Sequence, residues 1–84
     1  MYPKQREGLT IQVVGDETVV LDQTNDKIHQ LNATASLILE RCDGVTSDMM
    51  IANELTQRYA VDQNTVVRDV HRTIEQLKAL DLVY

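Results

Sequence analysis

The chain has 84 residues, a net charge of −5 and a single cysteine, which predicts one small globular domain. No apolar run approaches the roughly 20 residues of a membrane span, and one cysteine allows neither an internal disulfide nor a cysteine-built zinc site. The N-terminus lacks a signal-peptide h-region and the net charge disfavours nucleic acid or an anionic membrane as partner, so a cytoplasmic protein is expected.

The N-terminal third of the chain has the pattern of β-structure. Residues 1–84 are expected to form a single domain, within which residues 1–8 form a flexible arm. Apolar and polar residues then alternate over Leu9–Val13, which is the period of a half-buried strand. Gly15 and Asp16 form a plausible hairpin turn, and Thr18–Asp22 has the high β-propensity of a second strand.

A third strand is predicted over Lys27–Leu31, after a turn at residues 23–26 whose side chains hydrogen-bond their own backbone. Three strands joined by short turns form an antiparallel meander, with one face covered by helices. The strand order stays open at this stage. The third strand lies at an edge if the first or second lies in the middle.

A first helix follows the third strand directly. Asn32 is expected to cap its N-terminus, and the apolar side chains at helical spacing are Ala35, Ile38, Leu39 and Cys42. Asp43 and Gly44 end the run, since glycine suits the left-handed conformation after a last helical turn. Cys42 is therefore expected to be a buried small hydrophobe.

Two further helices are predicted. Thr46 or Ser47 caps the second helix, whose apolar face is Ile51, Ala52, Leu55 and Tyr59. Asp62 caps the third, which ends near Asp81 and carries one apolar stripe of Val67, Val70, Ile74 and Leu77, flanked by Val66 and Leu80. The expected fold class is therefore α+β, a three-stranded antiparallel sheet followed by three helices, similar to a winged helix-turn-helix.

Reactive residues do not converge on an active site in this sequence. His29 and His71 lack a third metal ligand, and no catalytic triad, phosphate loop or paired catalytic carboxylate is present. We therefore expect no enzymatic activity, no bound metal and no cofactor.

The ordered series of residues resembles the PqqD-like family, the peptide chaperones of pyrroloquinoline quinone biosynthesis and the wider class of RiPP recognition elements. The resemblance covers about residues 17 to 83, and Asp81 stands where the family usually has glycine. The matching pieces are Leu21-Asp22, Lys27 to Ala35, Asp43-Gly44, Ile51, Leu55, Arg58-Tyr59, Val61-Asp62, Asp69-Val70, Leu77 and Leu80 to Val83.

This resemblance implies a non-catalytic domain that binds the leader segment of a precursor peptide and presents the peptide to a radical or other modifying enzyme. In the family the leader adds as a strand beside the third strand, in a groove walled by the third helix. The peptide-binding residues expected here are Lys27, Ile28, His29, Gln30, Leu31, Val67, Arg68 and His71.

The residues themselves fit this role, because a three-stranded meander has two open edges that an extended peptide can extend. Two alternatives remain. One is a DNA-binding winged-helix regulator, in which basic side chains of the third helix would contact phosphates; these are Arg68, Arg72 and Lys78. The acidic side chains of Asp62, Asp69, Glu75 and Asp81 offset their positive charge. In a homodimer, open edges of two copies would pair.

Overall fold

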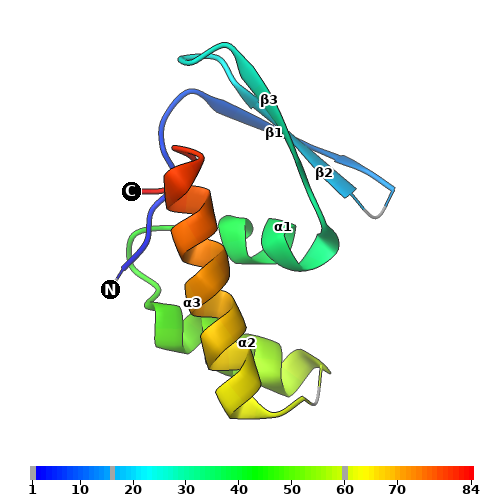
Figure 1. Ribbon diagram of the computed structural model, residues 1–84, viewed down its shortest axis with the longest axis vertical. Helices are drawn as coiled ribbons and strands as arrows, with labels where there is room; N and C mark the ends of the chain where they lie inside the picture. The colour runs from blue at the N-terminus through cyan, green and yellow to red at the C-terminus, as the bar shows by residue number, and fades with distance from the viewer. Residues whose placement is uncertain (1, 16, 60) are drawn as a thin grey trace.

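The computed structural model describes residues 2–15, 17–59 and 61–84, which form three strands followed by three helices (Figure 1). The predicted α+β fold is confirmed. The elements are β1 (Leu9–Val14), β2 (Glu17–Asp22), β3 (Lys27–Leu31), α1 (Ala33–Glu40), α2 (Asp48–Tyr59) and α3 (Gln63–Ala79). The sheet is antiparallel with order β1-β2-β3, so β1 and β3 are its two edges.

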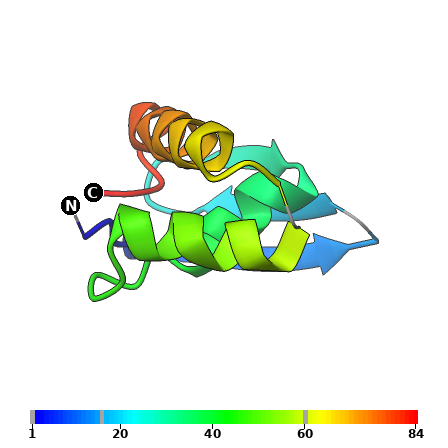
Figure 2. The same cartoon turned by 90° about the horizontal axis from the view of Figure 1, so that it is seen from below.

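One face of the sheet is covered by the helices. Along β2, Thr18, Val20 and Asp22 are buried, and they lie directly across from Leu31, His29 and Lys27 of β3. Side chains that lie opposite each other in an antiparallel pair point to the same face. Figure 1 shows α1 between the sheet and α2, and α3 running from the sheet end of the molecule past α1 to α2, while Figure 2 shows α2 and α3 side by side when seen from the end away from the sheet. The expected layering of a meander under helices is therefore present.

Local hydrogen bonds set the start of each helix. The Asn32 side chain accepts from the Ala35 N–H at 2.8 Å, and the Asp62 side chain accepts from the Thr65 N–H at 3.1 Å. Both caps were predicted from the sequence. For α2, the sequence allowed Thr46 or Ser47, and the structure selects Ser47, whose hydroxyl oxygen accepts from the Met50 N–H at 3.1 Å.

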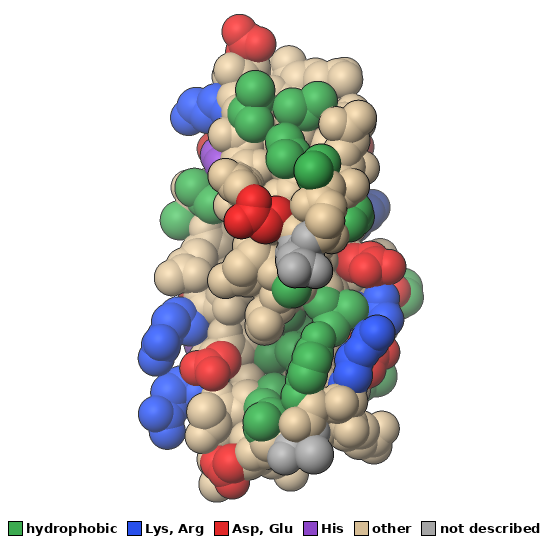
Figure 3. Space-filling view, turned by 90° about the vertical axis from the view of Figure 1, so that its right-hand side faces the viewer, with side chains coloured by type: hydrophobic (Ala, Val, Ile, Leu, Met, Phe, Trp, Pro, Cys, Tyr) green, Lys and Arg blue, Asp and Glu red, His purple; other side chains and the backbone are tan. Residues whose placement is uncertain are grey.

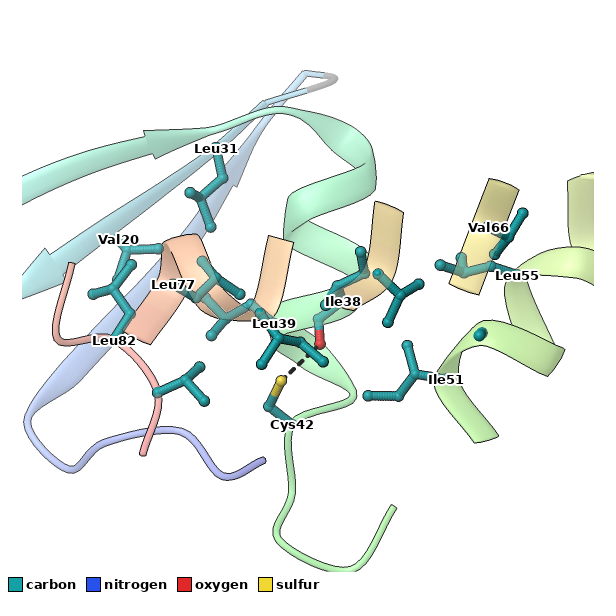
Figure 4. Packing of buried hydrophobic residues seen from close by; sticks show 14 residues of the cluster. Val20, Leu31, Ile38, Leu39, Cys42, Ile51, Leu55, Val66, Leu77 and Leu82 are labelled. Carbon is teal, nitrogen blue, oxygen red and sulfur yellow. Dashed lines mark hydrogen bonds between the residues drawn. The ribbon is translucent and has the colours of Figure 1, made fainter. Parts of the chain in front are cut away.

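The core is aliphatic and continuous from the sheet to the pair α2 and α3 (Figure 4). Val20, Leu77 and Leu82 lie at its sheet end, Ile51, Leu55 and Val66 at its other end, and Ile38 and Leu39 of α1 lie between. On α3 the fully buried stripe is Val66, Val70, Ile74 and Leu77, whereas Val67 is only half-buried. The predicted stripe therefore holds at three positions and is wrong by one residue at its start.

Cys42 is buried, as predicted, but it lies just after α1 and not within it. Its thiol donates to the Ile38 carbonyl at 3.1 Å (Figure 4). Burial and the neighbouring Asp43 carboxylate raise the pKa of the Cys42 thiol to about 11. Because the thiolate is the nucleophilic form of cysteine, this side chain is a packing residue.

Asp81, which stands where the family that the sequence resembles usually has glycine, forms the turn at the end of α3. Asp81 has a φ of 61°, in the left-handed region. The Leu82 N–H donates to the Leu77 carbonyl at 2.9 Å and the Asp81 N–H to the Lys78 carbonyl at 3.0 Å. This pair of bonds is the Schellman motif, in which glycine is the commonest left-handed residue and aspartate is tolerated at some cost. The turn therefore keeps its shape.

The N-terminal segment differs from the predicted flexible arm, because residues 3–6 are hydrogen-bonded into the fold. The Gln5 N–H donates to the Cys42 carbonyl at 2.9 Å, and the Tyr84 N–H donates to the Lys4 carbonyl at 2.9 Å. Pro3 is buried. The sequence pattern of a short polar segment does not reveal such pairing, because its partners lie about 40 and 80 residues away along the chain.

One sequence prediction involves a residue outside those that the structure describes. The predicted turn at Gly15-Asp16 includes residue 16, which lies outside the described residues. On α2 the predicted apolar face is confirmed at Ile51, Ala52 and Leu55, but Tyr59 is 50% exposed. The expected end of α3 near Asp81 falls two residues after its observed end at Ala79. No helix in the described ranges is both long and apolar enough to cross a membrane.

Candidate functional site

The edge strand β3 offers one unpaired row of backbone N–H and C=O groups, since β2 pairs with its other side only. Its side chains alternate between the two faces of the sheet. Lys27, His29 and Leu31 point to the helix side, while Ile28 and Gln30 point to the other. Ile28 is 73% exposed, and so a large apolar side chain stands on an uncovered face next to the open edge.

The turn before β3 is held by a buried carboxylate. Asp22 accepts hydrogen bonds from the Asn25 N–H at 3.1 Å and from the Asn25 side-chain amide at 2.8 Å. The Asn25 side-chain bond is the largest cause that lowers the pKa of Asp22. At the other end of β3, the Asn32 cap fixes the passage into α1. A rigid strand between two fixed ends is preorganised for pairing with a peptide.

A small apolar hollow, here called the three-helix pocket, lies beyond the end of β3. Its volume is about 290 Å³, at or below the low end of the roughly 300–1,000 Å³ of small-molecule sites, so it suits one side chain of a larger ligand. In Figure 3 hydrophobic side chains gather in the lower half of the molecule, at the level of α2 and the start of α3, between charged margins. The pocket is lined by Thr34, Ile38, Leu55, Tyr59, Val61, Val66, Asp69 and Val70.

Side-chain hydrogen bonds hold the start of α3 against α2. The Gln63 side-chain amide donates to the Asn53 side-chain carbonyl at 3.0 Å, which ties α3 to α2. Asp62 accepts from both the N–H and the hydroxyl of Thr65 at 3.1 Å. Between sheet and helices, the hydroxyls of Thr18 and Ser36 are hydrogen-bonded, which holds α1 on β2. The pocket walls therefore belong to fixed elements.

The pocket and the β3 edge are close in the chain. Thr34, at the pocket mouth, follows Leu31 by only three residues. A peptide that extends β3 past Leu31 therefore reaches the mouth of the pocket within a few residues. The pocket borders the side of α3 that carries Asp69, and we call this side the Asp69 flank.

The sequence-predicted site residues fall into two groups. Lys27, Ile28, His29, Gln30 and Leu31 form the β3 edge together. The other three, Val67, Arg68 and His71, lie on α3, where Val67 is half-buried and Arg68 and His71 are exposed. At about 100° per residue, Val67 and His71 point about 200° away from Asp69. The structure therefore does not place these two beside the three-helix pocket.

The pocket was not predicted from the sequence, although most residues that line it were expected on apolar helix faces or in the family match. Three helices and the segment between α2 and α3 contribute to the pocket, and no local sequence pattern predicts that these elements meet. A signal was present at Val61, an apolar residue directly before the Asp62 cap, which is 49% exposed in the structure. An apolar residue before a helix cap often packs against its own helix, but here Val61 lines the pocket.

His29 has an unusual environment on the helix side of β3. Its Nε2 atom is buried and has no hydrogen-bond partner among the described residues. No three His, Cys, Asp or Glu side chains within the described parts of the chain are grouped to hold a metal ion.

Comparisons with known proteins give the same fold. The chain superposes on the structure described as "TbiB1 in Complex with the TbiA(beta) Leader Peptide" with a TM-score of 0.84 at 24% identity, covering 95% of this chain and 93% of that one. It superposes on "Lasso peptide synthetase B1 complexed with the leader peptide" with a TM-score of 0.86 at 26% identity, covering 100% and 99%.

None of the curated proteins compared with the chain matches it. The sequence profile of the family described as "Coenzyme PQQ synthesis protein D (PqqD)" matches residues 17–83, which includes all of β2, β3 and the three helices. The chain therefore belongs to the PqqD family.

Proposed function

We propose that this chain binds the leader segment of a ribosomally made precursor peptide by strand addition to β3. The PqqD family is a family of peptide chaperones, and two solved structures with this fold are complexes with leader peptides. The observation in this chain that carries the proposal is an open strand edge that leads, within three residues, to an apolar pocket. Main-chain pairing supplies affinity in such recognition, and a pocket supplies specificity.

The expected contacts give a reversible complex of moderate affinity. A few backbone hydrogen bonds along Lys27–Leu31 contribute about 1 kcal/mol net each. One apolar side chain buried in the three-helix pocket contributes roughly 1.5–3 kcal/mol, and ordering of the flexible peptide takes back several kcal/mol. The balance fits a dissociation constant of about 1 μM, near −8 kcal/mol.

We propose that the chain itself performs no chemistry. Its thiol is buried with a raised pKa, and its role is to hold the precursor for a separate radical or other peptide-modifying enzyme in the cytoplasm. The pathway is that of pyrroloquinoline quinone or another modified peptide. The second edge, β1, remains open, so two copies can pair there as a homodimer while β3 is occupied.

The test is calorimetry of the chain against synthetic leader peptides from precursor genes beside its own gene. We expect one-to-one binding near a micromolar, and loss of binding when alternate backbone amides of the peptide are N-methylated. Binding that survives N-methylation at every position would contradict strand addition. If the enzyme modifies full-length precursor equally fast without this chain, the chaperone role is wrong.

A further inference from the structure

We propose that Asp69 makes the three-helix pocket selective for a leader whose apolar anchor residue has a basic residue beside it. The inference rests on the proposed function and adds the charge of the ligand. Among the described residues, the pocket walls are apolar except for Thr34, the Tyr59 hydroxyl and Asp69, and Asp69 is the only carboxylate among them. An apolar hollow with one negative group at its margin fits a side chain of hydrocarbon next to a cation.

The Asp69 carboxylate has no structural task in the free protein. Within the described residues it makes no hydrogen bond and no ion pair. Other aspartates of the chain do have such tasks, since Asp22 holds the turn before β3 and Asp62 caps α3. Asp69 is therefore available to a ligand.

The arginines that neighbour Asp69 on α3 form no ion pair with it within the described residues. Arg68 and Arg72 flank it along the helix, and both are exposed. A basic residue of the leader that lies over the Asp69 flank meets this carboxylate, whereas an acidic residue in the same place is repelled. The net charge of −5 also attracts a basic leader and repels an acidic one at longer range.

The expected preference is modest because Asp69 is exposed. Exposed charge pairs change affinities about two- to fivefold, so exchange of Lys for Glu beside the anchor, which turns attraction into repulsion, is expected to weaken binding about tenfold. The preference is expected to shrink at high salt, because surface charges are screened.

Selection from a random library of displayed 15-residue peptides tests the inference without a known leader. The wild-type chain, Asp69→Asn and Asp69→Lys are each used as bait, and Glu75→Gln is the control. Glu75 is an exposed acidic residue of the same helix, about 240° from Asp69 around the axis. Circular dichroism of each bait shows that it is folded.

We expect wild type and Glu75→Gln to enrich Lys or Arg next to one apolar anchor position. We expect Asp69→Asn to keep the anchor and lose the basic neighbour, and Asp69→Lys to enrich Asp or Glu there. If all baits enrich the same peptides with the same charges, Asp69 is not the determinant and the inference is wrong, although strand addition stands. If no bait enriches any peptide with an apolar anchor, the proposed function fails with it.

Discussion

The two open edges of the sheet differ in what lies beside them. β1 is the longer edge, with six uncharged residues, and its Val13 and Val14 side chains are 74% and 63% exposed. β3 has five residues, begins with a lysine and leads directly into α1 and the three-helix pocket. Both edges offer the same backbone groups to a peptide. A hollow of about 300 Å³ also borders Val13 of β1, but charged side chains, Glu40 and Arg58, help to line it. The three-helix pocket beside β3 is mainly apolar, and this apolar lining distinguishes the β3 side.

Blocking the pocket should have the largest effect on leader binding. Thr34 is exposed at the pocket mouth, and Thr34→Trp fills the hollow while leaving the β3 backbone free. Loss of one buried apolar anchor, about 1.5–3 kcal/mol, raises the dissociation constant about 10- to 150-fold. Calorimetry measures it, with Gln57→Trp on the exposed side of α2 as the control. If Thr34→Trp binds the leader with unchanged affinity, the pocket does not contribute to binding and does not distinguish the β3 edge from the β1 edge.

Charge placed on either flank of α3 decides which flank faces the leader. Val61→Asp puts a carboxylate into the pocket wall, and we expect a loss of about tenfold because burial of an unpaired charge is unfavourable. Val67→Asp, on the opposite flank, should leave binding by the folded fraction within about twofold. The reverse order of effects would support the sequence-predicted wall of Val67, Arg68 and His71 instead.

Proline scanning compares the two edges directly. Successive N–H groups of a strand point alternately to the neighbouring strand and to the open side, so one of Ile28→Pro and His29→Pro removes a free donor and the other breaks the sheet. The folded variant should bind leader about fivefold more weakly, since one bond contributes about 1 kcal/mol. The folded member of the pair Ile11→Pro and Gln12→Pro in β1 should bind as the wild type. If only the β1 proline variant binds the leader more weakly, the leader pairs with β1 and not with β3.

A change in stability at the end of α3, outside the three-helix pocket, provides the reference for these variants. Asp81→Gly relieves the left-handed backbone at the end of α3, while the exposed Arg6–Asp81 pair at 3.9 Å that it removes contributes little. We expect about 0.5–1 kcal/mol more stability, a rise in Tm of about 2–8 °C, and unchanged leader affinity. A fall in Tm would mean that the ion pair outweighs the backbone effect.

Much of the fold could be predicted because its signals are local. Caps at Asn32 and Asp62, alternation in the strands and the apolar faces of the helices each depend on neighbours within about one or two turns. The stripe of α3 was misplaced at its start because Val66 and Val67 lie four and three residues before Val70, and both spacings fit a helix. Only packing against Leu55 and Ile38 decides between them.

Of the two parts of the site, the β3 edge could be predicted from the sequence and the three-helix pocket could not. The β3 edge follows from three strands with short turns, together with the family resemblance that placed it at the edge. The three-helix pocket, in contrast, joins residues 34 to 70, and its position depends on how α1 sits between the sheet and the pair α2 and α3. The position of a helix over a sheet is a tertiary property, so nothing in the sequence near Asp69 or Val61 indicates that the two residues line one pocket.

The pairing of the two chain ends has a consequence for engineering and for gene architecture. The Tyr84 N–H donates to the Lys4 carbonyl, and both ends lie on the side of Figure 1 opposite to the start of α1. Adjacent surface ends are the geometry that tolerates domain insertion and circular permutation. The domain can therefore be spliced into a loop of a larger enzyme, or tethered to one at either end by a short linker, with its peptide-binding side still turned outward.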